Sequence, residues 1–213
     1  MPKKRPKSNK TVPRVLHIFC EGEKTEPIYL NGFIRKYHSG KRHIIVVEDT
    51  NKNTPIQLVE VAIAHRKANG LQEDEYWVVF DRESTTKYTH DNHLKAKDNA
   101  DRNNINIAFS NVCIEVWLLA HFSNSCAAYS CHDDLRRRSP LLNNLKSVGI
   151  NNYDKANYDL FEKLAPRLQN AITNAKQINN TAKAAAQHGR TAPCFLNPYT
   201  NMYDLLEAIN NFR

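Results

Sequence analysis

Long apolar segments are absent from this 213-residue sequence. No apolar run approaches ~18 residues, the length at which a helix begins to span a bilayer. The basic N-terminus is also not followed by an apolar stretch of signal-peptide type. We therefore expect no membrane-spanning helix, no export and a cytoplasmic location.

Paired cysteine motifs are absent as well. The five cysteines are an odd number without the two-pair spacing of a zinc site: Cys20, Cys113, Cys126, Cys131 and Cys194. Cys126 and Cys131 lie close together but have no second pair nearby. We expect all five to be reduced thiols, as is usual in the cytosol.

Acidic residues are missing from the first 14 positions, which hold six basic residues: Lys3, Lys4, Arg5, Lys7, Lys10 and Arg14. The net charge is +8, so only +2 remains for everything after this segment. We interpret residues 1–13 as a disordered basic tail that either attracts a polyanion or serves solubility. A second basic cluster, Arg136-Arg137-Arg138, follows Asp133-Asp134 and fits a solvated helix face as well as a phosphate contact.

What the chain does contain is an alternation of strand and helix patterns. Short β-branched or apolar runs predict strands over residues 15–20, 43–48, 75–80 and 105–109. Helical patterns separate them, over 27–37, 54–69 and 89–103, with Thr54 capping the second helix. This order predicts an α/β fold, with a mostly parallel sheet of about four strands flanked by helices.

The C-terminal part carries mainly helical signals. We expect helices over 135–148, from 164 toward 186, and after a cap at Thr200. The predicted organisation is therefore a core over 14–125 with a helical part over 126–213 packed on it.

The first predicted strand ends abruptly in acids. Glu21, Glu23 and Glu26 follow its apolar residues, with Gly22 allowing a tight turn and Thr25 able to cap the next helix. Open α/β sheets place their sites at the carboxyl ends of strands. Carboxylates so close together repel one another, and a hard divalent cation would keep them ionised. The alternative is a solvated acidic loop beside a helix N-terminus.

The third predicted strand ends in acids too. Asp81 and Glu83 are two residues apart, so both can point the same way while Arg82 points opposite. In a parallel sheet this strand end lies on the same edge as Glu21, so the three acids can meet across 60 residues of sequence. The alternative is that these acids merely begin a loop.

A third candidate lies in an apolar segment over 112–122, which predicts a buried helix capped by Ser110 or Asn111. Glu115 lies inside this segment, where a carboxylate is costly unless it is paired or binds a metal. A position near the helix N-terminus, where the dipole stabilises it, explains Glu115 as well as metal binding does. For His121 we favour a core histidine hydrogen-bonded to backbone over a ligand.

Together these motifs resemble the RloB-like proteins, which belong with Toprim-fold nucleases related to the overcoming-lysogenization-defect nucleases. The motifs are Glu21-Gly22-Glu23-Lys24-Thr25-Glu26-Pro27-x-Tyr29, Phe80-Asp81-Arg82-Glu83, Ser110 to Phe122, and Asn197-Pro198-Tyr199-Thr200. The second is similar to the Asp-x-Asp of the Toprim third strand, and the third is the most specific. This chain departs at Glu83, which stands in place of an aspartate but can still ligate, and at Val112, which replaces a proline.

The resemblance implies a Toprim-like catalytic core that cleaves phosphodiester bonds with one or two Mg²⁺ or Mn²⁺ ions. Carried over by position, the metal ligands would be Glu21, Glu26, Asp81 and Glu83, with Glu115 as a further candidate. Clustered acids without histidine or thiol also favour these ions over Zn²⁺. Lys155 could stabilise phosphate charge in the transition state, although a plain surface lysine explains it too.

The resemblance also implies partners and a setting. Relatives act in bacterial defence against phage, often beside an ATPase, and some Toprim effectors cut transfer RNA. The alternative is a non-catalytic module that binds nucleic acid or an ATPase through the basic tail. Strand passage or primer synthesis would need domains for which this chain is too short.

Overall fold

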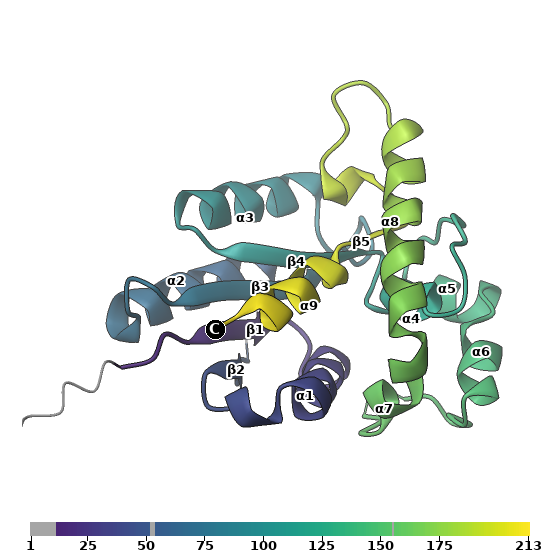
Figure 1. The fold of residues 1–213 in the computed structure, drawn as a ribbon. Helices are drawn as coiled ribbons and strands as arrows, with labels where there is room; N and C mark the ends of the chain where they lie inside the picture. Colours follow the sequence, from purple (N-terminus) through teal and green to yellow (C-terminus); the bar gives the residue numbers. More distant parts are fainter. Residues whose placement is uncertain (1–11, 52–53, 155) are drawn as a thin grey trace, which may run out of the picture.

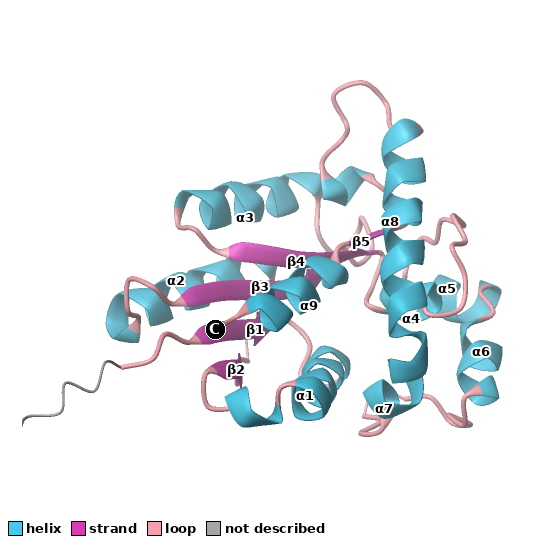
Figure 2. Ribbon diagram, viewed as in Figure 1, coloured by secondary structure: helices cyan, strands magenta, loops and turns pink. Residues whose placement is uncertain are grey.

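The predicted α/β architecture is confirmed by a computed structural model, which describes residues 12–51, 54–154 and 156–213. Five strands form one sheet in the order β2-β1-β3-β4-β5 (Figures 1 and 2). They are β1 Leu16–Cys20, β2 Ile45–Glu48, β3 Glu75–Asp81, β4 Asn106–Asn111 and β5 Tyr199–Thr200. The first four are parallel, and the short β5 pairs antiparallel with β4.

Helices cover both faces of this sheet, as the strand–helix alternation predicts. On one face α2 (Pro55–Asn69) and α3 (His90–Arg102) pack over Phe19, Tyr76 and Val78. The opposite face is covered by α1 (Thr25–Tyr37) and by the C-terminal helices. These are α4 Glu115–Ala120, α5 His132–Arg138, α6 Leu141–Ser147, α7 Leu160–Leu164, α8 Leu168–Ala184 and α9 Met202–Asn211.

Alternation along β1 explains how one strand supports two cores. Leu16, Ile18 and Cys20 point into the core shared with α1, whereas Phe19 points into the core beneath α2. Residues from both ends of the chain meet in the first of these cores, because Leu205 and Phe212 of the C-terminal part are buried with them. The C-terminal part therefore shares its main core with the sheet.

The connection from β4 to α4 differs from the sequence prediction. Ser110 and Asn111 do not cap the helix, because β4 continues through both of them and α4 begins only at Glu115. The cause is the unpredicted strand β5: Ser110 Oγ lies 3.0 Å from Thr200 Oγ1, and the Asn111 side chain donates to the Leu196 carbonyl at 2.6 Å. Thr200, expected as a cap, is itself part of β5.

The helix starts were predicted with mixed success. Thr54 caps α2 as expected, because its Oγ1 accepts the Gln57 N–H at 3.3 Å. Thr25 was wrong as a cap, since it is the first residue of α1 and Lys24 precedes the helix without a side-chain cap bond. Thr25 is buried.

The sequence predicts no membrane-spanning helix and no disulfide bond. Within the described residues, no helix has the length and apolar character needed to cross a membrane. All five cysteines lie in the described ranges and none forms a disulfide.

Candidate functional site

The carboxyl ends of β1, β3 and β4 lie side by side at one edge of the sheet, and an acidic cavity of about 770 Å³ opens there. All five acids singled out in the sequence line it: Glu21, Glu26, Asp81, Glu83 and Glu115. Glu23 and Asp133 add two more carboxylates, against the lysines Lys24 and Lys87. The topology thus assembles the acidic residues as expected, although 94 positions separate Glu21 from Glu115.

Glu21 directly follows β1 and is poorly compensated. Its Oε2 accepts the Asp81 N–H at 3.2 Å. Its Oε1 is buried and has no hydrogen-bond partner among the described residues. Burial is the main reason that its pKa is raised from 4.5 to about 7, and Glu83 and Glu26 add to it, while the Asp81 N–H and Lys87 oppose it. A carboxylate in this state gains from any cation that reaches Oε1.

Asp81, the last residue of β3, is likewise an acid whose ionised form is disfavoured. Its Oδ2 accepts the Ile114 N–H at 3.0 Å, which ties the strand end to the segment before α4. Burial raises the pKa of Asp81 well above its ordinary value, with further increases from the charges of Glu26, Glu115 and Glu21. Glu21 therefore destabilises the ionised form of Asp81, as expected for like charges held close.

Glu26 is held near them by α1. It is the second residue of that helix and only 6% exposed, in the first turn where the dipole favours a negative charge. Gly22 has a role beyond a flexible turn, because a Cβ at this position would overlap the Glu26 carboxylate. Any larger residue here would displace the Glu26 carboxylate from its present position.

Glu83 is paired with a lysine that the sequence reasoning missed. Lys87 Nζ lies 3.0 Å from Glu83 Oε1, four residues further on. Arg82 points to the other side as predicted; it is 3% exposed and donates to the carbonyls of Tyr88 and Cys194. The spacing of four between Glu83 and Lys87 was visible in the sequence, but no helical pattern marked it.

Glu115 has partners that neither sequence alternative included. As the first residue of α4 it is 1% exposed, and its Oε1 accepts the Tyr153 O–H at 3.0 Å. His132 Nε2 lies 3.3 Å from the same oxygen. Burial raises the pKa of Glu115, but the hydrogen bond and charge of His132 outweigh it, and the pKa is lowered to about 2. In the sequence, only the free-energy cost of burying a carboxylate indicated that Glu115 has a partner. No pattern placed that partner at position 132.

The remaining candidates lie away from the cavity or outside the described residues. His121 is a fully buried core histidine, as favoured, because its Nδ1 donates to the Trp117 carbonyl at 3.0 Å and its Nε2 faces Tyr29 Oη at 3.1 Å. Lys155 and the tail residues Lys3, Lys4, Arg5, Lys7 and Lys10 fall outside the described residues.

The basic cluster at the end of α5 is partly neutralised. Arg138 and Arg137 lie 2.9 and 3.5 Å from the Asp134 carboxylate, while Arg136 donates to the Tyr153 carbonyl at 3.4 Å. The side chains of Arg137 and Arg138 are still 79% and 56% exposed, so an anion can reach them. α5 also carries His132 at its first position, which brings the cluster within two turns of the cavity.

Fold and site together define an α/β protein with a buried carboxylate cluster at the carboxyl edge of a mostly parallel sheet. The chain belongs to the RloB-like protein family, whose sequence model matches residues 16–209. That range includes all seven acids that line the cavity. No curated protein and no solved structure matches the chain.

Proposed function

We propose that this protein is a divalent-metal-dependent nuclease of the Toprim type, which hydrolyses phosphodiester bonds in the acidic cavity. The observation that carries the proposal is the buried Oε1 of Glu21, which has no hydrogen-bond partner in the described part of the chain, beside Asp81, whose ionised form is disfavoured by three neighbouring acids. A site that gathers carboxylates whose ionisation is unfavourable is suited to binding a cation. The cation can in turn bridge the site to an anionic substrate.

The donor set fits Mg²⁺ or Mn²⁺. Glu21, Glu26, Asp81 and Glu83 offer only carboxylate oxygens, the ligands that these hard ions prefer. Among the described residues no three ligand atoms of these acids lie within 4.8 Å of one another, so the side chains must rotate toward a bound ion. Glu115 is the least available ligand, because its Oε1 is already shared by Tyr153 and His132.

The chain's own residues have separate tasks in this proposal. A bound ion would lower the pKa of a water molecule and neutralise charge on the leaving oxygen. Lys87 and Lys24 attract the substrate phosphate to a cavity that would otherwise repel it. Lys87 would take the phosphate-stabilising task for which Lys155 was one candidate in the sequence. The Tyr153–Glu115–His132 contacts hold the wall of the cavity beside Asp81.

The family resemblance extends the proposal to a substrate and a setting. Nucleic acid is the proposed substrate, with transfer RNA favoured over DNA. The proposed setting is cytoplasmic bacterial defence against phage. An ATPase is the proposed partner. The exposed arginines of α5 support a polyanionic substrate, because their guanidinium groups suit phosphate contacts.

Cleavage assays test the proposal directly. The full chain should cut transfer RNA, single-stranded DNA or duplex DNA with Mn²⁺ or Mg²⁺, and EDTA should abolish the cutting. Glu21→Gln and Asp81→Asn should each lower the rate by at least about 100-fold, because each removes a charge that binds the ion.

Glu73→Gln is the matched control, since Glu73 is exposed and lies before β3, at the opposite edge of the sheet. It should cleave at the rate of the unchanged protein. If no substrate is cut with either ion while nucleic acid still binds, the nuclease proposal is wrong. The protein is then best explained as a non-catalytic nucleic-acid-binding module.

A further inference from the structure

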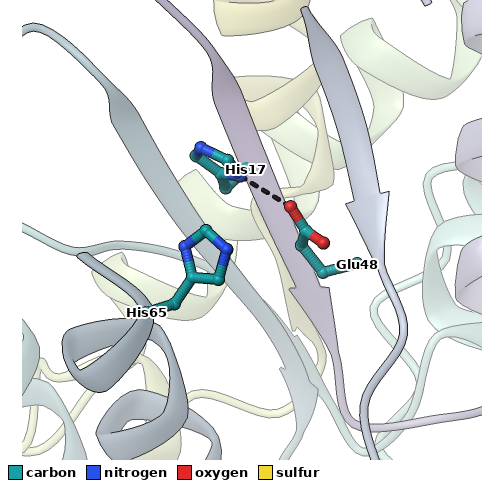
Figure 3. Close-up of side chains that lie close together, drawn as sticks. All are labelled: His17, Glu48 and His65. Carbon is teal, nitrogen blue, oxygen red and sulfur yellow. Dashed lines mark hydrogen bonds and ion pairs between the residues drawn. The ribbon is translucent and has the colours of Figure 1, made fainter. Parts of the chain in front are cut away.

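A second group of metal-ligating side chains lies away from the acidic cavity, on the α2 face of the sheet. His17 of β1, Glu48 at the end of β2 and His65 of α2 converge there (Figure 3). One ligand atom of each lies within 4.8 Å of the others, and no other such group of three occurs within the described residues. We propose that these three residues bind a late first-row divalent cation of the Zn²⁺ class.

The distances suit such an ion. His17 Nδ1 lies 2.6 Å from Glu48 Oε1, and the His17 and His65 ring centroids are 4.6 Å apart. Ligands bound at 2.0–2.2 Å to a tetrahedral Zn²⁺ are about 3.4 Å from each other. The pair His17–Glu48 must therefore open by less than about 1 Å, while His65 moves closer. We expect the Glu48 and His65 side chains to rotate toward the ion while the backbone of the strands stays in place.

The surroundings supply the outer contacts that metal-binding histidines usually have. His17 Nε2 lies 3.8 Å from Asp74 Oδ2. The Asp74 side chain is 3% exposed and accepts two backbone hydrogen bonds, from the Val15 N–H and the Leu71 N–H, each at 2.7 Å. When Nδ1 binds a cation, its proton can move to Nε2 and face the Asp74 carboxylate. A carboxylate in this position orients the imidazole and strengthens it as a ligand.

The donor set selects the ion. Two imidazoles and one carboxylate with an open fourth position are typical of Zn²⁺ sites, whereas Mg²⁺ prefers oxygen ligands only. The site is also shielded but reachable: His17 is 9% exposed and stacks on Tyr76, while the Glu48 side chain is 23% exposed. A bound ion would join β1, β2 and α2, so it would stabilise the sheet edge next to the acidic cavity.

This site is independent of the proposed nuclease. His17 lies four residues before Glu21, the residue that follows β1, so the backbone positions of these two residues are about 13 Å apart. Either site can therefore be removed without the other.

Equilibrium dialysis of the full chain with Zn²⁺ tests the inference. We expect one Zn²⁺ per chain and a melting temperature that rises with Zn²⁺ concentration. His65→Ala and Glu48→Gln should each weaken binding at least about 100-fold, more than the loss of an outer contact typically costs. His65 is half-buried at the helix surface, so its truncation leaves the fold intact.

Two controls separate this site from others. His188→Ala removes an exposed surface histidine, and Asp81→Asn alters the acidic cavity. Both should retain the Zn²⁺ stoichiometry and affinity of the unchanged protein, and excess Mg²⁺ should not compete. Equal Zn²⁺ binding by His65→Ala and the unchanged chain, or no binding at all, would overturn the inference and leave the group as a packed His–Glu hydrogen bond.

Discussion

At the scale of single residues, Glu21 is an acid whose charge the fold compensates poorly. Its pKa is raised from 4.5 to about 7, so between these values the folded protein binds a proton that the unfolded chain releases. Stability must then fall as the pH rises from 4.5 to 7, and stay low above 7. One pKa unit corresponds to about 1.4 kcal/mol, so Glu21→Gln should stabilise the metal-free protein at pH 8 by at most about 3.5 kcal/mol.

Urea denaturation at several pH values in EDTA measures this effect. Glu21→Gln should flatten the decline in stability between pH 4.5 and 7, and Glu73→Gln should not. Mg²⁺ or Mn²⁺ should restore stability to the unchanged protein more than to Glu21→Gln, because only the former gains from neutralising the charge. A variant that is less stable than the unchanged protein at pH 8 would contradict the electrostatic account.

Glu115 has the opposite pH dependence. Its pKa is lowered from 4.5 to about 2, so its ionised form stabilises the fold above pH 4.5, and this contribution is lost as the pH falls toward 2. Glu115→Gln should lower the free energy of unfolding at pH 7 by about 1–3 kcal/mol, because it leaves His132 without its buried counter-charge. Tyr153 can still donate to the glutamine oxygen.

A double-mutant cycle with His132→Gln isolates this pair. The two substitutions together should cost less than the sum of the single ones, because the shared interaction is removed only once. If Glu115→Gln is as stable as the unchanged protein without metal, then the His132 contact contributes nothing, and Glu115 belongs with the acids that await an ion.

These residues also indicate what a sequence can reveal about a site. Glu21 and Asp81 were predictable, because each directly follows a buried strand and parallel strands bring such ends to one edge. His132 was not, since it approaches from a segment whose path depends on tertiary packing, and Lys87 was missed because no helical pattern marks its spacing of four from Glu83. The His17–Glu48–His65 group was missed for a related reason: its members lie within or at the ends of regular elements, where they pass for ordinary core or surface positions.

At the scale of elements, β5 is the feature that no local pattern announced. It has two residues, Tyr199 and Thr200, and runs antiparallel to an otherwise parallel sheet. Asn179 of α8 anchors it: the side chain donates to the Thr200 carbonyl at 2.8 Å and accepts the Thr200 N–H at 3.0 Å. The sequence predicted about four strands, and the sheet has a fifth, β5. The Asn179 side chain bonds the Thr200 backbone in the way that a neighbouring strand would, and hydrophobic periodicity cannot reveal such a contact.

This anchor gives an element-scale prediction. Asn179 is 1% exposed, so Asn179→Ala leaves a buried N–H and a buried carbonyl without partners. We expect the free energy of unfolding to fall by about 2–4 kcal/mol, measured by urea denaturation at pH 7. The neighbouring Asn180 is exposed on the same helix, and Asn180→Ala should change stability by less than about 0.5 kcal/mol. Equal effects of the two substitutions would show that β5 does not depend on this anchor.

At the scale of the whole molecule, the chain combines an acidic cavity with an overall positive charge. The net charge is +8, and five of the positive charges belong to Lys3, Lys4, Arg5, Lys7 and Lys10. The described contacts of the N-terminal segment begin at Arg14, whose side chain donates to the Arg213 carbonyl at 3.0 Å and lies over the Phe212 ring. Val12, two residues earlier, is 72% exposed.

Removing residues 2–11 should therefore preserve the fold and weaken nucleic-acid binding. Every phosphate that the protein no longer neutralises reduces the slope of log K against log salt concentration by about 0.9 on duplex DNA and about 0.7 on single strands. Fluorescence anisotropy across a salt series measures this slope, while the urea midpoint should be unchanged.

A full-length variant with the five basic residues replaced by glutamine should behave like the truncation, because charge rather than length supplies the affinity. If the slope is the same in all three proteins, the exposed arginines of α5 must supply the phosphate contacts, and Arg137→Gln with Arg138→Gln should then reduce it instead.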